Sequence, residues 1–157
     1  MSTGIDISPT ATAIATDLAE KKHLTCHFIA ADVTADITSI IGVHETDLFE
    51  FAYDWNLLHH LFPDQREQYV KNVYAALKPQ SPYLSVCFSE KDPHFGGAGK
   101  YRKTAIGTLL YFSSEKELRE LFLPHFTIEM LEPIQIPGRT VIHHGLYVFM
   151  TKRKHKE

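Results

Sequence analysis

The chain has 157 residues, of which 44% are hydrophobic and 22% charged, and its formal net charge is −3. This length is enough for one domain with a sizeable core. The slightly negative charge argues against a nucleic-acid-binding protein, and no apolar run reaches the roughly 18 residues that a membrane-spanning helix needs. Cys26 and Cys87 lack a CxxC spacing and are expected to be free thiols in the cytoplasm.

The first predicted elements are a strand and a helix joined by a very short turn. The stretch "GIDIS" (4–8) indicates the end of an apolar strand that finishes at Asp6. Ser8 is a suitable N-cap and a proline follows it, so a helix is expected over 9–22. A strand that ends in an acid and turns at once into a helix is typical of nucleotide-type folds.

Two further apolar runs follow, and each also ends at an acid. The run 24–32 predicts a second strand ending at Asp32, and a short helix is expected near 34–42. The run 47–55 predicts a third strand, with Asp54 at its end.

The second half of the chain carries clearer helix boundaries. Apolar residues at helical spacing predict a helix over 63–78, which a proline ends, and 83–88 is expected to be a fourth strand. The segment 89–112 is expected to be a long loop with some local structure. Ser114 begins a capping box, which predicts a helix to about residue 123.

The chain closes with two β-rich runs, 126–136 and 143–152, separated by a turn at Pro137 and Gly138. This pattern indicates an antiparallel pair.

The alternation of strands and helices predicts an α/β fold in which parallel strands have right-handed crossovers and helices on both faces. Ligands of such sheets bind beyond the carboxyl ends of the strands. Asp6, Asp32 and Asp54 are therefore expected along one rim, where they favour a nucleoside-like ligand. The alternative is that each is a helix cap or turn residue, two positions where Asp is common.

In this order the motifs resemble those of class I S-adenosylmethionine-dependent methyltransferases, from the family's second strand onward. The similarity covers nearly the whole chain and lies in five stretches: "GIDIS" (4–8), "AADV" (30–33), "FEFAYDWNLLHHL" (49–61), "YVKNVYAALKPQSPYLSV" (69–86) and the closing hairpin (126–152). The resemblance implies a Rossmann-like, mostly parallel sheet with an antiparallel C-terminal hairpin, in a single domain over 1–157.

The resemblance also implies S-adenosylmethionine as the cofactor. Asp6 would bind its ribose hydroxyls, Asp32 its adenine, and residues after the third strand its methionine end. The residues expected to contact the cofactor are Asp6, Ile7, Ser8, Asp32, Val33, Asp54, Trp55 and Asn56. For Trp55, a half-buried place in the core is an equal alternative.

One departure from the family matters. Only three residues precede Gly4, so the family's first strand and its glycine-rich loop are not in this chain. In the family that strand is central, and without it two apolar strand edges would be exposed. We therefore expect a truncated domain, weak cofactor binding by this chain alone, and self-association through the exposed edges.

The acceptor of the methyl group is expected to be a small molecule, such as a thiol or a thiopurine-like compound, because of the similarity of residues 49–88 to small-molecule methyltransferases. The segment 89–104 is the expected lid over it. Tyr101 and Arg102 are candidates for binding an anionic acceptor, and a solvated loop is the alternative.

The adjacent histidine pairs of the chain favour a catalytic base over a metal site. His59-His60 and His143-His144 are adjacent pairs, which cannot share one face of a helix or strand, and no HExxH motif occurs. We therefore predict no metal site. His59 or His60 is a candidate catalytic base, and packing on a helix surface is the alternative.

Two other functions compete with methyl transfer. A dehydrogenase could place Asp6 on the ribose of NAD, although it needs the same absent glycine loop. A non-catalytic remnant, acting as a partner subunit, is the second alternative.

Overall fold

In the computed structural model, residues 2–42, 48–96 and 98–154 are described, and the chain divides into two compact units, Met1–Leu48 and Phe49–Glu157. Each unit is described by itself below. The prediction of one domain over the whole chain stays a prediction. Among the described residues, no helix is both long and apolar enough to cross a membrane.

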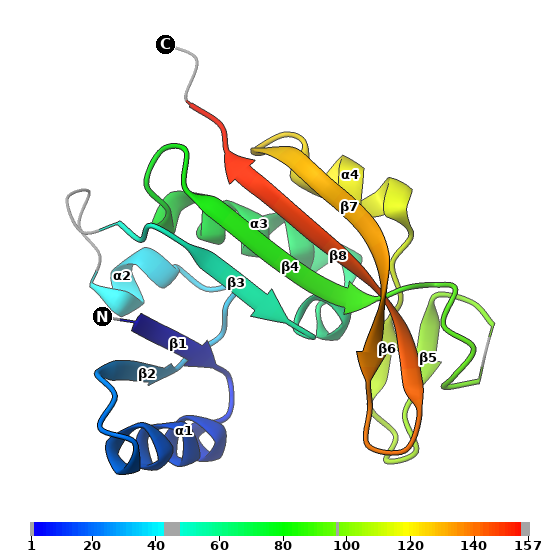
Figure 1. The fold of residues 1–157 in the computed structure, drawn as a ribbon, viewed down its shortest axis with the longest axis horizontal. Helices are drawn as coiled ribbons and strands as arrows, with labels where there is room; N and C mark the ends of the chain where they lie inside the picture. Colours follow the sequence, from blue (N-terminus) through cyan, green and yellow to red (C-terminus); the bar gives the residue numbers. More distant parts are fainter. Residues whose placement is uncertain (1, 43–47, 97, 155–157) are drawn as a thin grey trace. The chain divides into compact units, whose positions relative to one another are not determined.

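The described residues of the first unit form two parallel strands and two helices, which Figure 1 draws. They are β1 (Ser2–Asp6), α1 (Pro9–Lys21), β2 (Cys26–Ala30) and α2 (Ile37–Ile41). As predicted, the hydroxyl of Ser8 caps α1 by accepting the amide of Ala11 at 3.2 Å. The strand register pairs Asp6 with Ala30, so both strands end at the same edge.

The first unit has little buried apolar surface. Among its described residues, only Thr12, Ala19 and Ile37 are buried. Five of its large apolar side chains are exposed: Ile7, Ile14, Leu18, Leu24 and Ile40. Because burial of apolar area provides most of the stabilisation of a fold, this unit is weakly stabilised by its own contacts.

The second unit is built on a four-stranded sheet with the order β3-β4-β8-β7, and a separate hairpin, β5-β6. Its elements are β3 (Ala52–Trp55), the 3-10 turn η1 (Leu58–His60), α3 (Pro63–Ala76), β4 (Pro82–Phe88), β5 (Tyr101–Lys103), β6 (Leu109–Tyr111), α4 (Glu115–Phe122), β7 (Phe126–Pro137) and β8 (Ile142–Lys152). The strands β3 and β4 are parallel, whereas β4-β8 and β8-β7 are antiparallel. The parallel pair and the closing antiparallel hairpin are confirmed.

Local signals explain the element boundaries. Ser114 and Glu117 form the predicted capping box, in which each side chain accepts the backbone amide of the other at 3.2 and 2.8 Å. Gly138 donates its amide to the carbonyl of Val141 at 2.9 Å and closes the β7-β8 turn. The third strand is shorter than expected, because Ala52 is its first paired residue. Residue 47, where that strand was expected to begin, lies outside the described residues.

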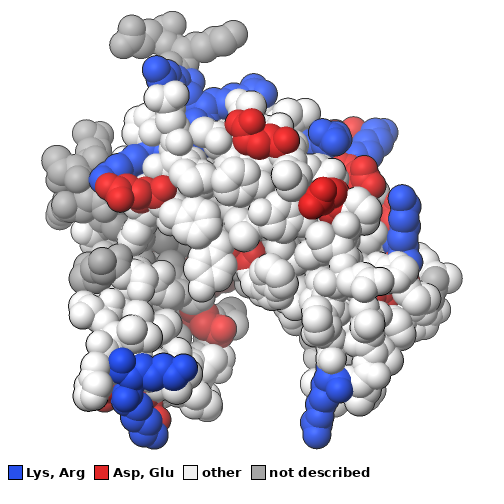
Figure 2. Space-filling model, in the orientation of Figure 1, with Lys and Arg blue, Asp and Glu red and all other residues white. Residues whose placement is uncertain are grey.

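The two faces of the four-stranded sheet differ. Tyr83 contacts Tyr69 of α3 and Phe122 of α4, so both helices cover the same face, and Figure 1 shows both behind the sheet. The expectation of helices on both faces is therefore not met within the second unit. Uncharged side chains gather over the strands on the opposite face, as Figure 2 shows. Because side chains alternate along β3, Tyr53 and Trp55 point away from the face that buries Asp54, and they are 69% and 52% exposed.

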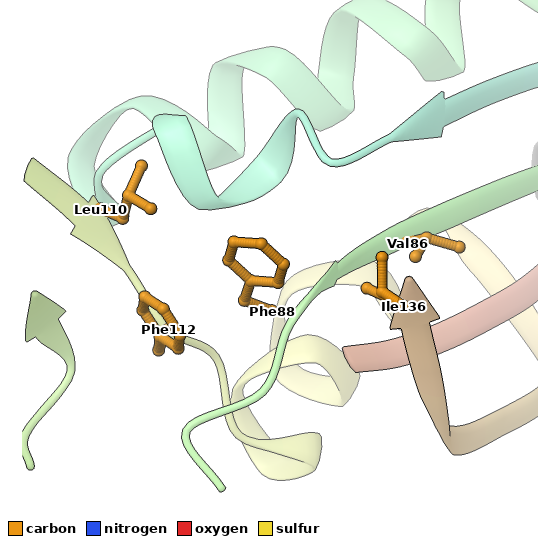
Figure 3. Close-up of a cluster of buried hydrophobic side chains, with 5 residues drawn as sticks. All are labelled: Val86, Phe88, Leu110, Phe112 and Ile136. Atoms are coloured by element: carbon orange, nitrogen blue, oxygen red, sulfur yellow. The ribbon is translucent and has the colours of Figure 1, made fainter. Parts of the chain in front are cut away.

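A compact apolar cluster joins the far end of the sheet to the β5-β6 hairpin (Figure 3). It consists of Val86, Phe88, Leu110, Phe112 and Ile136. Figure 3 shows Phe88 at the end of β4, between Leu110 and Phe112 on one side and Ile136 on the other. The segment expected to be a loop is therefore partly ordered as two short strands, and it is packed against the sheet.

Candidate functional site

Asp6 lies where β1 ends, with its side chain at the surface. Its Oδ1 accepts the amide of Ser8 at 2.8 Å, and Oδ2 has no protein partner in the described part of the chain. Ile7 is 73% exposed. One carboxylate oxygen of Asp6 therefore shapes the turn, and the other is available to accept hydrogen bonds from a ligand.

Asp32 lies two residues after the end of β2, at the same edge of the parallel pair. Its Oδ1 accepts the amide and the hydroxyl of Thr34 at 2.8 and 2.7 Å, and these bonds lower the pKa of Asp32. Val33 follows it with a half-buried side chain. Asp6 and Asp32 are thus both turn residues, as the alternative interpretation expected, and both carboxyl groups lie at the expected rim.

A groove lies next to Asp6 within the first unit. It has a volume of 170 Å³ and is lined by β1, α1 and one ring of β2, that of Phe28. Pockets for small ligands usually have volumes of about 300–1,000 Å³. The carboxylates of this unit suit the ribose and adenine of a nucleoside, but the groove of this unit does not enclose a whole one.

Asp54 is fully buried in the second unit, on the face that α3 covers. Its Oδ2 accepts the hydroxyls of Tyr83 and Tyr69 at 2.5 and 3.0 Å, and its Oδ1 accepts that of Ser85 at 3.1 Å. Burial raises the pKa of Asp54 to about 6, although the three hydroxyls oppose this effect. Because its carboxylate is surrounded by these internal donors, we do not retain Asp54 as a cofactor ligand.

The two residues after Asp54 lie at the carboxyl end of β3. Trp55 is 52% exposed, so the alternative of a half-buried place in the core is wrong for it. Asn56 adopts a positive φ of 64° and donates its amide to the carbonyl of Val86 at 2.8 Å. The side-chain oxygen Oδ1 of Asn56 is buried, and it has no hydrogen-bond partner among the described residues. An acceptor left without a donor is costly, so Asn56 is a candidate for contact with a ligand.

The two histidines proposed as bases lie in the turn η1. His59 is 2% exposed, its Nδ1 accepts the amide of Phe88 at 3.4 Å, and its ring stacks on that of Phe88. Burial lowers the pKa of His59 to about 3 and also lowers that of His60. His59 is therefore a neutral packing residue at physiological pH, and the structure favours the packing alternative for it.

Arg102 holds the segment after β4 in place. Its guanidinium is 3% exposed and donates to four backbone carbonyls, those of Gly99, Glu90, His94 and Asp92. Because these bonds occupy the guanidinium, we do not retain Arg102 as an acceptor-binding residue. Tyr101 is 55% exposed and contacts Phe62 and Tyr111, so its hydroxyl stays a candidate.

A cavity with both polar and apolar lining residues opens at the carboxyl end of β4. It has a volume of 220 Å³ and is lined by residues that follow β4 and by the β7-β8 hairpin: Ser89, Lys91, Pro133, Ile134, Gln135, His144 and Gly145. The sequence analysis placed Ser89 and Lys91 in the expected lid and named His144 as one of an adjacent pair, but it did not bring them together, because they come from segments far apart in the chain. Hydroxyl, amide, imidazole and ammonium groups around a small cavity can hold a polar ligand.

The predicted residues thus fall into two groups. Asp6, Ile7, Ser8, Asp32 and Val33 lie at the end of the parallel pair in the first unit, and Asp54, Trp55, Asn56, Tyr101 and Arg102 lie in the second. The parallel strand pairs and the antiparallel closing hairpin agree with the α/β fold that the resemblance to S-adenosylmethionine-dependent methyltransferases implies.

Comparison with known sequences agrees with this class. The profile of the family described as "Methyltransferase domain" matches residues 1–80. This is half of the chain, and the chain belongs to that family. No curated protein sequence matches the chain.

Solved structures share the fold. An S-adenosylmethionine-dependent methyltransferase from Methanosarcina mazei is 20% identical with a TM-score of 0.79, and the match covers 98% of this chain and 83% of that one. A structure described as "Conversion of a Disulfide Bond into a Thioacetal Group during Echinomycin Biosynthesis" is 23% identical with a TM-score of 0.75, covering 96% and 66%. The 1,6-didemethyltoxoflavin-N1-methyltransferase of Burkholderia thailandensis, with bound 1,6-didemethyltoxoflavin and S-adenosylhomocysteine, is 23% identical with a TM-score of 0.67, covering 97% and 61%. The chain thus spans less than two thirds of the last two proteins. The resemblance inferred from the motifs is confirmed, and S-adenosylmethionine is the cofactor of this class.

Proposed function

We propose that this chain transfers a methyl group from S-adenosylmethionine to a small-molecule acceptor. The observation that carries the proposal is the pair of carboxylates, Asp6 and Asp32, at the common end of two parallel strands within the region that matches the methyltransferase family. Each has one oxygen engaged in a local turn and directs the other to solvent. In this proposal Asp6 accepts the ribose hydroxyls and Asp32 accepts the adenine amino group.

The residues of the second unit have different tasks. Bound S-adenosylmethionine would supply an electrophilic methyl carbon on a sulfonium. Asn56 would offer its unpartnered Oδ1 at the end of β3, and the exposed ring of Trp55 would exclude water. Tyr101 and the cavity after β4 would hold the acceptor. Most of the acceleration would come from alignment of the two reactants, which needs no further group.

A sulfur acceptor suits the chemistry best. A thiol or thiopurine attacks as a soft nucleophile and needs little help from a base, and His59 is neutral with its Nδ1 occupied. One of the similar structures concerns conversion of a disulfide bond into a thioacetal group. The products would be a thioether and S-adenosylhomocysteine, with the thiol proton released to solvent.

Calorimetry with S-adenosylhomocysteine tests the cofactor assignment. Asp6→Ala removes a carboxylate proposed to accept two hydroxyls, so affinity should fall by about tenfold to a hundredfold, or roughly 1.5–3 kcal/mol. Asp17→Ala, which removes an exposed carboxylate of α1, is the matched control and should bind like the parent. Equal affinity of Asp6→Ala and the parent would remove Asp6 from the site, and no binding by the parent would contradict the proposed function.

Three related expectations stay predictions. They are a cytoplasmic location, the absence of a nucleic-acid partner, and self-association through strand edges. In the described part of the chain, β1 pairs only with β2 and β3 pairs only with β4. The strands β1 and β3 therefore each have one edge without a partner strand, which could pair with another copy.

A further inference from the structure

Two histidines and one aspartate lie close together in the second unit, next to the end of β4. Asp92 and His94 belong to the segment after β4, and His143 is near the start of β8. Three potential ligand atoms, one from each residue, lie within 4.8 Å of one another. The Nδ1 atoms of His94 and His143 lie 3.2 and 3.1 Å from Oδ1 and Oδ2 of Asp92.

We propose that Asp92, His94 and His143 form a site for a divalent transition-metal ion such as Zn²⁺. Zinc bonds of about 2.0–2.2 Å at tetrahedral angles place neighbouring ligand atoms roughly 3.3–3.6 Å apart. The two nitrogen–oxygen separations in the structure, 3.2 and 3.1 Å, are only a few tenths of an ångström shorter. Small movements of the rings would therefore create the coordination sphere.

The cluster is held together by bonds that metal binding leaves intact. Oδ1 of Asp92 accepts the amide of His94 at 2.7 Å, and Oδ2 accepts the amide of His144 at 2.6 Å. Arg102 donates to the backbone carbonyls of Asp92 and His94 and so fixes the segment that carries them. The ligands are thus positioned by backbone contacts as well as by their own side chains.

Access to the cluster also suits a cation. The side chains of Asp92 and His143 are 0% and 10% exposed, whereas that of His94 is 33% exposed. The partly exposed side at His94 leaves room for entry of the ion and for water as a further ligand.

The donor set decides the kind of metal. Two imidazole nitrogens and one carboxylate oxygen suit Zn²⁺, Co²⁺ or Ni²⁺, whereas Mg²⁺ and Ca²⁺ prefer oxygen ligands alone. Binding at Nδ1 requires each neutral imidazole to carry its proton on Nε2. The two Nδ1–H bonds to Asp92 that the metal-free cluster can form are then replaced by bonds from each Nδ1 to the metal.

The sequence argument against a metal overlooked this arrangement. The sequence argument assumed that both histidines of an adjacent pair would bind the same metal ion. Successive side chains of a strand point to opposite faces, so that arrangement is excluded. Here only His143 of its pair is used, and its partners lie about fifty positions earlier in the chain, as the Asp92–His143 contact spans 51 residues.

The test is titration of the full chain, dialysed against chelator, with Zn²⁺ by calorimetry and with Co²⁺ by visible absorption. We expect one saturable site with a Kd below about 10 μM and ligand-field bands from Co²⁺. His94→Ala should weaken binding at least about tenfold and abolish the bands. His144→Ala is the matched control, because it removes the adjacent exposed imidazole but keeps the amide that holds Asp92.

Different results would overturn the proposal. No Zn²⁺ uptake by the parent at 100 μM (an upper limit about tenfold above the expected Kd), equal binding by His94→Ala and His144→Ala, or displacement of Zn²⁺ by equimolar Mg²⁺ would each do so. His94→Gln is a second variant that removes the imidazole ligand, and it should weaken Zn²⁺ binding as His94→Ala does. Thermal melting checks that each variant is folded. The outcome is independent of the proposed methyl transfer, since the readout is metal binding alone.

Discussion

The buried carboxylate of Asp54 makes the stability of the chain depend on pH in an unusual direction. In the unfolded chain Asp54 titrates near 3.8, whereas burial raises its pKa in the folded unit to about 6. The folded state therefore keeps the proton over a pH range in which the unfolded state has lost it. The stabilising contribution of protonated Asp54 to the free energy of unfolding is fully present below its pKa in the unfolded chain. That contribution is lost as the pH rises through its pKa in the folded state.

The magnitude follows from this difference between the two pKa values. Each pKa unit corresponds to about 1.4 kcal/mol, so the complete loss is roughly 3 kcal/mol. Between about pH 4.5 and pH 7 the loss is about 2 kcal/mol, because part of it has already occurred at the lower pH. This is a large fraction of the stability of a typical small domain.

Asp54→Asn is the perturbation that isolates this effect. Asparagine is uncharged at both pH values and has nearly the same shape, and its amide can still bond to the hydroxyls of Tyr69, Tyr83 and Ser85. We therefore expect the variant to gain about 2 kcal/mol relative to the parent between about pH 4.5 and pH 7.

Urea unfolding of both proteins at the two pH values measures this change. The comparison between proteins removes the effects of other titrating groups, which both chains share. A stability difference that is the same at the two pH values, or that shifts in favour of the parent as the pH rises, would refute the reasoning.

Two further predictions concern close packing in the second unit. Gly145→Ala would place a Cβ against the side chain of Ile136, and 3.0 Å from the carbonyl oxygen of Cys87, so it should destabilise the chain by about 1–3 kcal/mol. Thermal unfolding should show partial recovery when Ile136→Val is added, and no recovery would contradict this account. Arg102→Met leaves four carbonyls without their donor and should cost roughly 2–4 kcal/mol, with faster amide exchange at His94. Unchanged exchange at that amide would show that Arg102 does not hold the segment.

Short-range signals in the sequence determined most of the secondary structure. Ser8 and Ser114 cap helices where they were expected to, because a cap depends only on residues within one turn. Pro137 and Gly138 mark the turn between the last two strands for the same reason. The order of these elements, together with the motifs, was enough to identify the methyltransferase fold.

The environment of side chains was decided by the tertiary structure. Along β3 the side chains alternate, so Tyr53 and Trp55 face outward while Asp54 is turned toward α3. The sequence showed an acid at a strand end but not which face it would occupy, since a shift of one residue would reverse every side chain.

The contacts of Arg102 and Asp92 also could not be predicted from the sequence, because they join residues that lie farther apart in the chain. Arg102 was expected to face a ligand, yet it binds carbonyls that lie up to 12 residues away. Asp92 meets His143 across 51 residues because the segment after β4 folds back onto the start of β8. Local sequence fixes caps, turns and periodicity, which depend on neighbours in the chain. Which polar groups become buried together depends on how distant segments pack, and only the folded structure contains that information.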